Sequence, residues 1–499
     1  MRYLVSAEEM REYDSNTIEK IGIPACVLME RAALAAADRI EEYFESSGAS
    51  RHVLVMAGTG NNGGDGLAVA RLLSERDYQV EVWTVGDPGR ASGQWKRQME
   101  ILKNYPVKCT DRPGRREYGT LVDALFGVGL TRAVEGMYGE AVETFQGLGG
   151  WRLSVDMPSG IDTDTGKALG KAVKADATVT FGFCKRGLVL YPGQEYAGEV
   201  RIADIGISHR SFFGRKPLMY AYDESAAALL PGRDRGGNKG TFGKVLLAAG
   251  SVNMAGAAVL AAKACYRTGA GMVKVITPPE NRVILQQAVP EALLGTYEDL
   301  EAGMEWADVI AVGPGLGKSK EALACLEQVT EGSAKPLLVD ADGLNLLSEQ
   351  PKLCGLLSEQ GRAGRVILLT PHVGELSRLL GCSMADCKEK LWSAGGALSA
   401  RLHAVVAAKD ARTFICAENH DVCVNLTGNN GMGTAGSGDV LTGIIAALLA
   451  QGMDGFGAAA VGAYVHGRAG DEVSAARGAY ACMAGDMAET LGRVLQGLS

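Results

Sequence analysis

Apolar runs alternate with segments of helical periodicity along the N-terminal part of the chain. Two helical patterns cover residues 8–47, and further ones lie at 66–76 and 93–105. The remaining apolar runs predict strands at 52–57, 79–85, 118–127, 151–160, 177–183 and 198–206. Strands that are apolar throughout are buried on both faces, so the pattern predicts a parallel sheet between two layers of helices.

The same alternation begins again after a polar stretch rich in Gly and Arg. A strand, a helix and a strand are predicted at 243–251, 255–271 and 272–278. Five more apolar segments continue the pattern, at 307–317, 335–347, 365–376, 403–410 and 413–418. We therefore predict an α/β chain of two three-layer αβα domains, at 1–215 and 236–499, joined by a linker at 216–235.

Length, charge and cysteine spacing narrow the possible functions. The chain has 499 residues, too many for one ordinary core, and a net charge of −8 without a basic run. Nucleic acids and membranes are therefore not expected as partners. We find no secretory signal, no apolar run near the roughly 18 residues of a membrane span, and no C-x2-C pair among the eleven cysteines. We expect free thiols and a cytoplasmic protein.

A glycine-rich loop follows the first strand and raises the question of a nicotinamide cofactor. Residues 58–63 fit the dinucleotide-binding pattern G-x-G-x-x-G. A dehydrogenase would also need an acidic residue about 20 positions later for the ribose, and Asp87 matches this requirement loosely. The carboxylate of Asp65 would repel a bound pyrophosphate, so this loop by itself is a weak indication of a dehydrogenase.

A second glycine-rich loop, at 428–438, leads directly into an apolar helix. The amides of Gly436, Ser437 and Gly438 would lie at the helix N-terminus, where unpaired N–H groups and the helix dipole favour an anion. Asp439 follows in the first turn and could act as a base for a hydroxyl that attacks a phosphate. The same four residues could instead form a glycine-rich turn with an ordinary acidic residue at the helix start.

Other C-terminal segments favour the phosphate-binding interpretation. They are NKGTFGKVLLAAGS (238–251), MAGAAVLAAKACYRTGAGMVKV (254–275), VGPGLG (312–317), VDADGLNLL (339–347), LTPHVGEL (369–376) and GNNGMGTAGSGDVLTG (428–443). With these motifs, residues 225–495 resemble the ADP/ATP-dependent NAD(P)H-hydrate dehydratases of the ribokinase-like superfamily. The resemblance implies a ribokinase-like fold for this half.

The N-terminal half carries a second set of motifs. They are AEEMREYD (7–14), GIPACVLMERAA (22–33), AGTGNNGGDGLAVARLL (57–73), LVDALFGVGLTR (121–132) and SVDMPSGIDTDTG (154–166). Residues 1–215 thereby resemble the Rossmann-like NAD(P)H-hydrate epimerase domain. The whole chain is similar to the bifunctional NAD(P)H-hydrate repair enzymes. Such an enzyme interconverts the R and S hydrates of NADH or NADPH at C6 and dehydrates the S form using a nucleotide phosphate.

The resemblance also implies an epimerase site. Its hydrate-binding residues would be Asn61, Asn62, Gly63, Gly64, Asp65, Gly127, Val128, Gly129, Leu130, Thr131, Arg132, Ala133 and Asp156. Asn62, Asp123 and Ser159 would hold potassium, which takes hard oxygen ligands. Asp156 is the candidate acid/base for inverting C6, since proton movement at a carbinolamine needs a positioned carboxylate.

For the dehydratase, the resemblance places the hydrate near Ala257, Gly315, Gly317, His372 and Asp439. The nucleotide, expected to be ADP with Mg²⁺ on its phosphates, would contact Lys409, Asp410, Ala411, Arg412, Thr413, Asn429, Gly431, Gly436, Ser437 and Gly438. Asp439 would deprotonate the C6 hydroxyl so that it attacks the terminal phosphate. Two departures concern the nucleotide contacts, since this chain has Asp410 and Asn238 where the family usually has Gly and His.

Two alternative functions remain open at this stage. A ribokinase-like kinase of a small hydroxymethyl vitamin precursor would share Asp439 and the anion site, and would release a stable phosphorylated product. Alternatively, the N-terminal half could be a binding module without catalytic activity. The expected ligands of the repair enzyme are hydrated NADH or NADPH and ADP, and we expect a homo-oligomer.

Overall fold

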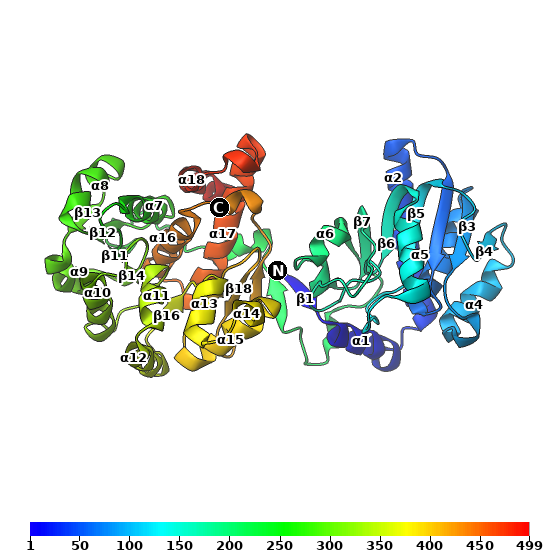
Figure 1. Cartoon of the computed structure of the whole chain (residues 1–499), viewed down its shortest axis with the longest axis horizontal. Coiled ribbons are helices and arrows are strands. Elements are labelled where there is room, and N and C mark those ends of the chain that lie inside the picture. The colour runs from blue at the N-terminus through cyan, green and yellow to red at the C-terminus, as the bar shows by residue number, and fades with distance from the viewer. Residues whose placement is uncertain (499) are drawn as a thin grey trace. The chain divides into compact units, whose positions relative to one another are not determined.

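The chain folds into two compact units (Figure 1). The computed structural model describes residues 1–498, with one unit at Tyr3–Leu218 and the other formed by Met1–Arg2 and the residues from Met219 onward. The segment expected to be a linker, 216–235, therefore contains the first elements of the C-terminal unit. These elements are strand β10 (Met219–Ala221) and a 3-10 helix at Glu224–Leu229, and β10 pairs in parallel with β19 (Val422–Asn425).

A parallel sheet forms the centre of the N-terminal unit, with strand order β4-β3-β2-β5-β6-β7-β9. Its strands are β2 (His52–Ala57), β3 (Gln79–Thr84), β4 (Lys108–Thr110), β5 (Glu117–Ala124), β6 (Gly149–Val155), β7 (Ala177–Phe181) and β9 (Glu199–Ala203). One face packs on α2 (Ala25–Ser47), α3 (Asn61–Glu75) and α4 (Gly93–Leu102). The other face packs on α5 (Gly136–Gln146), which completes the predicted three layers.

Helix α3 begins earlier than the sequence pattern indicates. It starts at Asn61 rather than near 66, so Gly63, Gly64 and Asp65 lie inside the helix instead of in a loop. The glycines explain this position. A side chain on Gly63 would overlap the carbonyl of Gly58, because the first turn of α3 lies directly against the loop that follows β2.

The C-terminal unit contains a second sheet with strand order β13-β12-β11-β14-β15-β16-β17-β18-β19-β10. Its pairs are parallel except those that β18 makes with β17 and β19. Its further strands are β11 (Lys244–Ala248), β12 (Met272–Ile276), β13 (Leu293–Gly295), β14 (Val309–Val312), β15 (Leu337–Val339), β16 (Ile367–Leu369), β17 (Val405–Ala408) and β18 (Thr413–Cys416).

Helices cover both faces of this second sheet (Figure 1). One face packs on α7 (Ala255–Arg267), α16 (Ser437–Ala450), α17 (Gly455–Arg477) and α18 (Ala484–Leu498). The other face carries α9 (Leu300–Trp306), α10 (Lys320–Glu331), α11 (Asp342–Ser348), α12 (Pro351–Arg362), α13 (Val373–Leu380), α14 (Met384–Glu389) and α15 (Leu391–Leu402). Along residues 1–498, we find no helix with the length and apolarity needed to cross a bilayer.

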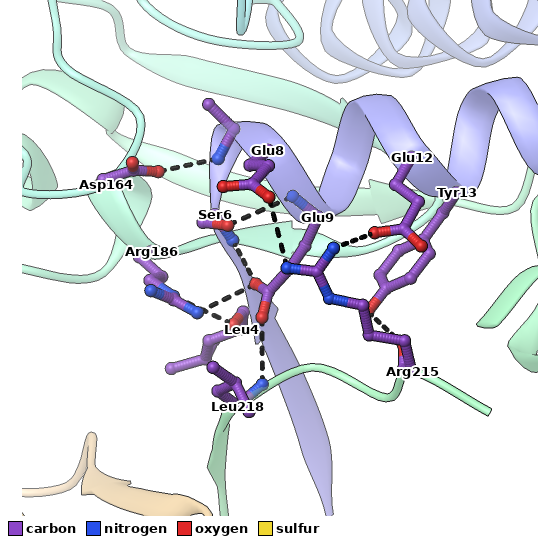
Figure 2. Close-up of polar contacts among 11 residues, drawn as sticks. Leu4, Ser6, Glu8, Glu9, Glu12, Tyr13, Asp164, Arg186, Arg215 and Leu218 are labelled. Carbon is purple, nitrogen blue, oxygen red and sulfur yellow. Dashed lines mark hydrogen bonds and ion pairs between the residues drawn. The ribbon is translucent and has the colours of Figure 1, made fainter.

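A buried carboxylate connects three distant segments of the N-terminal unit (Figure 2). Glu9 lies in α1 (Ala7–Ser15), which follows strand β1 (Arg2–Val5), and its side chain is almost completely buried. The carboxylate accepts hydrogen bonds from the Ser6 amide at 2.7 Å, the Arg186 guanidinium at 2.8 Å and the Leu218 amide at 3.0 Å. Glu9 therefore caps its own helix and fixes the ends of this unit.

Replacement of Glu9 tests the importance of this connection. We expect Glu9→Ala to lower the free energy of local opening of β1 and α1 by about 3 kcal/mol, because it leaves a buried guanidinium without its carboxylate. Hydrogen exchange of the amides in these elements measures the change. The matched variant Glu8→Ala removes an exposed carboxylate that pairs with Arg215, and should change the opening free energy by less than about 0.5 kcal/mol. Equal effects of the two variants would contradict the assigned role of Glu9.

Candidate active sites

The N-terminal unit contains a cavity of about 560 Å³, which we call the N-terminal cavity. It lies at the carboxyl ends of β2, β5, β6 and β7, beside α1 and α2. The strand order reverses between β2 and β5, and ligands of open α/β sheets bind at such a point. Eight of the predicted ligand-binding residues line this cavity: Asn61, Asn62, Asp65, Gly127, Val128, Gly129, Leu130 and Asp156.

The other predicted residues of this site do not line the cavity. Gly63 and Gly64 are buried within α3, where Gly64 lies next to the side chain of Met29. Thr131, Arg132 and Ala133 are exposed in the loop after β5. The cavity also contains residues that the sequence analysis missed, namely Asp14, Gln94, Tyr138 and Lys185.

Asp156 lies directly after β6 with a backbone conformation that is unusual for a residue other than glycine. Its φ angle is 69°, and such strain is frequent where a side chain must be held in one direction. Oδ1 accepts hydrogen bonds from Lys185 Nζ at 2.6 Å and from Thr180 Oγ1 at 3.3 Å. Lys185 also donates to the carbonyl of Phe181 at 2.8 Å, so the ion pair is anchored at the end of β7.

Two further carboxyl groups line the same cavity. Burial, with the charges of Asp156 and Asp14, raises the pKa of Asp65 well above its ordinary value. Burial and Asp156 also raise the pKa of Asp14. The ammonium of Lys185 acts on both groups in the opposite direction. The cavity therefore combines an ion-paired carboxylate with carboxyl groups that hold a proton to higher pH than ordinary aspartates.

Two of the three residues predicted to hold potassium, Asp123 and Ser159, are hydrogen-bonded to each other, and the third, Asn62, lines the N-terminal cavity. Asp123 is completely buried and accepts hydrogen bonds from Ser154 Oγ at 2.8 Å, Ser159 Oγ at 2.6 Å and the Ser159 amide at 2.8 Å. Burial raises the pKa of Asp123. Asn62 Nδ2 is buried without a hydrogen-bond partner, so its amide is available to a ligand. Carboxylate, hydroxyl and amide oxygens fit a monovalent cation, although Asp123 is also used to fix Ser159.

In the C-terminal unit, Asp439 lies in the first turn of α16. The N-cap residue of this helix, Gly436, has a φ of 91°, and a side chain there would overlap Leu260. Only glycine therefore fits this helix start. Burial and the charge of Asp340, opposed by Lys409, raise the pKa of Asp439 to about 6. Asp439 is therefore a carboxylate near neutral pH that accepts a proton readily, beside a helix N-terminus that favours anions.

Lys409 extends from the end of β17 toward the same helix start. Its Nζ lies 2.8 Å from Asp340 Oδ1, and Thr442 Oγ1 of α16 donates to Asp340 Oδ2 at 2.6 Å. A Cβ atom on Gly438 would lie 3.4 Å from Lys409 Nζ. Burial lowers the pKa of Lys409, but Asp340 and Glu375 raise it more, so the ammonium stays charged beside the predicted phosphate site.

His372, which the resemblance places near the hydrate, has a structural role at the start of α13. It is the N-cap of α13, and its Nδ1 accepts a hydrogen bond from the Gly374 amide at 2.9 Å. The carboxylate of Glu375 accepts from the His372 amide at 2.8 Å, which completes a capping box. Burial and Lys409 lower the pKa of His372, and burial raises that of Glu375 to about 7. About half of the imidazole is exposed, and its Nε2 lies 3.3 Å from Glu375 Oε1.

Several predicted nucleotide contacts also stabilise the loops. Arg412 is buried and donates to the carbonyl of Leu426 at 2.9 Å, and Asn429 donates to Asp471 at 2.9 Å and accepts from the Gly431 amide. Ala411 is exposed, and Thr413 begins β18. The unusual Asp410 lies 3.8 Å from Lys388, which partly compensates its charge.

The remaining predicted residues of the C-terminal site lie around the glycine turns after β14. Gly315 and Gly317 have φ angles of 59° and 74°. A side chain on Gly315 would meet the Ala257 methyl at 2.7 Å, so this turn approaches α7 closely. Asn238 accepts from the Gly240 amide and thus caps a turn.

His466, which the sequence analysis missed, lies 3.2 Å from Ser437 Oγ, and burial lowers its pKa to about 4.

Comparisons with known proteins divide the chain in the same way as the motifs. Residues 25–187 match the family described as YjeF-related protein N-terminus, and residues 245–493 match the family described as NAD(P)H-hydrate dehydratase. A bifunctional NAD(P)H-hydrate repair enzyme of Moorella thermoacetica is 37% identical, over 99% of this chain and 97% of the relative. A protein of the same name from Thermofilum pendens is 38% identical, over 94% of this chain and 92% of the relative.

A solved structure supports the fold of the C-terminal unit. A ribokinase-like superfamily protein from Enterococcus faecalis is 28% identical, with a TM-score of 0.51, over 56% of this chain and 97% of that protein. Together with the parallel and the mostly parallel sheet, each covered by helices on both faces, this likeness confirms the predicted α/β class and the ribokinase-like C-terminal fold. The roles of individual site residues stay predictions.

The ion pair of Asp340 and Lys409 can be tested through stability. We expect Asp340→Asn to destabilise the C-terminal unit by about 3 kcal/mol, because the buried ammonium of Lys409 loses its counter-ion. Calorimetric unfolding of the full chain measures this change. Asp410→Asn is the matched control and should cost less than about 0.5 kcal/mol, since Asp410 and Lys388 are more exposed. If the double variant with Lys409→Met is no more stable than Asp340→Asn alone, the pair does not act as described.

Proposed function

The chain belongs to the family of bifunctional NAD(P)H-hydrate repair enzymes, and we propose that the two candidate sites carry its two reactions. It is an enzyme with an epimerase domain followed by a dehydratase domain. A kinase that releases a stable phosphorylated product is not favoured, because the relatives matched over nearly their whole length are repair enzymes.

In the N-terminal cavity, Asp156 is the proposed acid/base for the interconversion of the R and S hydrates at C6. The cavity is large enough for the modified nicotinamide and its ribose, and it lies where nucleotides bind in open α/β sheets. Strained backbone and the ion pair with Lys185 hold the Asp156 carboxylate in one orientation. Potassium, when bound by Asn62, Asp123 and Ser159, would supply positive charge that attracts the phosphates or amide of the nucleotide.

In the C-terminal unit, Asp439 is the proposed base of the dehydratase, and its position in the first turn of α16 is the observation that carries this assignment. Asp439 takes the proton of the C6 hydroxyl, and the resulting alkoxide attacks the terminal phosphate of the nucleotide. The new P–O bond forms as the bond between this phosphate and the rest of the nucleotide breaks, so that ADP leaves as AMP. Phosphate then leaves C6 with the C–O electron pair, and loss of a ring proton restores the dihydronicotinamide. Phosphate is a better leaving group than hydroxide, which explains why the reaction consumes a nucleotide.

The nucleotide is proposed to extend along Lys409–Thr413 and the loop 429–438. The amides of α16 and the Lys409 ammonium offer positive charge to its phosphates, and ADP is the proposed nucleotide. Magnesium would neutralise charge on the phosphates during transfer. The carboxylate of Asp342, whose charge contributes to the raised pKa of Asp439, would offer an oxygen ligand to such an ion.

We also propose that the enzyme works in the cytoplasm as a homo-oligomer, without nucleic-acid or membrane partners. The net charge of −8 without a basic run supports the last part of this proposal, since polyanions would be repelled.

The direct test of the function is incubation of hydrated NADH with the purified protein, Mg²⁺ and either ADP or ATP. We expect recovery of the near-ultraviolet absorbance of the intact dihydronicotinamide ring and release of free phosphate. Both hydrate epimers should be consumed, because the epimerase feeds the S form to the dehydratase. A stable phosphorylated product, or no recovery with either nucleotide, would overturn the repair function.

Variants of the two aspartates should separate the two activities. We expect Asp439→Asn to lower dehydration by a factor of about 10²–10⁴ and to keep epimerisation, because it removes only the base of the C-terminal site. Asp156→Asn should lower epimerisation by a similar factor and keep dehydration of the S hydrate. Chromatography of the two epimers, with and without nucleotide, measures both rates on the same sample. Epimerisation at the wild-type rate in Asp156→Asn would refute the role of that residue.

The raised pKa of Asp439 predicts the pH dependence of dehydration. Asp439 accepts a proton only when it is ionised, so kcat/KM should fall as the pH drops through about 6, and should be constant above this value until another group titrates. A pH series of initial rates checks the position of the fall. The phosphates of the nucleotide also take up a proton near this pH. The affinity for the nucleotide, measured over the same pH series, is therefore the control that separates this effect from the protonation of Asp439. A rate that stays constant well below pH 6 would exclude Asp439 as the base.

A further inference from the structure

Lys185 is an unusually buried lysine that forms an ion pair with the proposed acid/base Asp156. Only 1% of its side chain is exposed, in β8 (Cys184–Lys185), whose backbone pairs in register with β1. Removing an ammonium from water costs several kcal/mol, so such a residue needs strong compensation. The partners that compensate it are the Asp156 carboxylate at 2.6 Å and the Phe181 carbonyl at 2.8 Å.

The contacts of Asp156 divide its two oxygens between different tasks. Both hydrogen bonds from Lys185 and Thr180 end on Oδ1. Oδ2 lies on the side of the ligand-binding loop, because a Cβ atom on Gly127 would come within 3.2 Å of it and of the Asn62 carboxamide. One oxygen therefore anchors the carboxylate, and the other faces the space where the loop would hold a ligand.

Asp65 is the second carboxyl group of this cavity with properties suited to proton transfer. It is the fifth residue of α3, beyond the first turn in which the helix dipole favours an anion. Burial, Asp156 and Asp14 raise its pKa well above the ordinary value, and Lys185 opposes this shift. The charged and titratable groups that line the cavity are Arg11, Asp14, Asp65, Tyr138, Asp156 and Lys185. Among them, Arg11 donates to the carbonyl of Val128 rather than to a carboxylate.

We propose that Lys185 is a positioning residue that holds the Asp156 carboxylate in place as the base, and that Asp65 of the same cavity is the acid in the epimerisation. This assignment rests on the proposed epimerase function of the N-terminal unit. Asp156 forms an ion pair with Lys185, whereas burial raises the pKa of Asp65, so that Asp65 keeps a proton that it can donate. That difference is what an acid and a base in one site require.

The two carboxyl groups account for each proton transfer of the reaction, and no redox step is needed. Asp156 takes the proton of the C6 hydroxyl, the O–H electrons form the C6=O bond, and the C6–N1 bond breaks with its electrons going to N1. Asp65 gives its proton to N1. Rotation about the C5–C6 bond presents the other face of the aldehyde to N1, which attacks C6 again. The N1 proton returns to Asp65, and the alkoxide regains its proton from Asp156, so that only the configuration at C6 has changed.

Variants that preserve shape can separate this role from a structural one. Lys185→Met removes the charge and keeps a similar length, Lys185→Arg keeps the charge, and Asp65→Asn removes only the titratable proton. The control Lys171→Met changes an exposed lysine of the same unit, which pairs with Glu143. Each rate is the conversion of R to S hydrated NADH without nucleotide, corrected for the uncatalysed reaction, over a pH series.

For Lys185→Met, we expect kcat for epimerisation to fall about 100-fold with KM changed less than about threefold. Lys185→Arg should recover most of the rate, and Lys171→Met should match the wild type. A Lys185→Met rate within threefold of the wild type would overturn the positioning role.

For Asp65→Asn, we expect kcat to fall about 100-fold and the alkaline limb of the pH profile to disappear, since that limb reports loss of the acid's proton. A wild-type rate and alkaline limb would refute the acid assignment. If Lys185→Met fails to fold, as judged by circular dichroism, Asp65→Asn and Lys185→Arg decide the question. A wild-type protein that fails to epimerise would overturn the proposed function itself, whereas active wild type with unaffected variants overturns only this inference.

Discussion

Each unit of this protein places a lysine ammonium against a buried aspartate where its sheet meets the candidate ligand. Lys185 pairs with Asp156 in the N-terminal unit, and Lys409 pairs with Asp340 in the C-terminal unit. In the low dielectric of the interior, an unpaired charge at either position would be costly, so each pair depends on both partners. Burial raises the pKa of the neighbouring Asp65 and Asp439, the aspartate of each pair adds to this effect, and the lysine opposes it. The pairs therefore connect the packing of the fold with the acid–base chemistry of both sites.

Glycine supplies the second constraint, because it lets a helix N-terminus approach the strand ends. At Gly63 the first turn of α3 touches the loop after β2, and at Gly436 the chain turns into α16 beside α7. Any side chain at these two positions would move the helix away from the sheet. The glycine-rich motifs of the two halves thus share a structural purpose, although one site is proposed to bind a damaged nicotinamide and the other a phosphate.

The sequence predicted the features that depend on neighbours along the chain. Asp439 was found because Gly436–Gly438 and the apolar helix are adjacent to it, and the strands were found from their apolar runs. The start of α3 was missed, because its glycines disfavour a helix locally and only packing against Gly58 reveals their purpose. Lys185 and Asp340 were missed for a different reason. Their partners are 29 and 69 positions away, and only the folded sheet brings them together.

The contacts of the buried Glu9 determine how long a segment must be for the N-terminal unit to be transferred intact to another protein. Its carboxylate binds Arg186 and the Leu218 amide, so the first ten residues complete a unit whose recognisable family motif begins only at residue 25. A recombination event that moved residues 25–187 alone would leave Arg186 without its acceptor. The longer segment from β1 to Leu218 keeps these contacts, so it is the piece of chain that could be transferred without leaving the guanidinium of Arg186 unpaired.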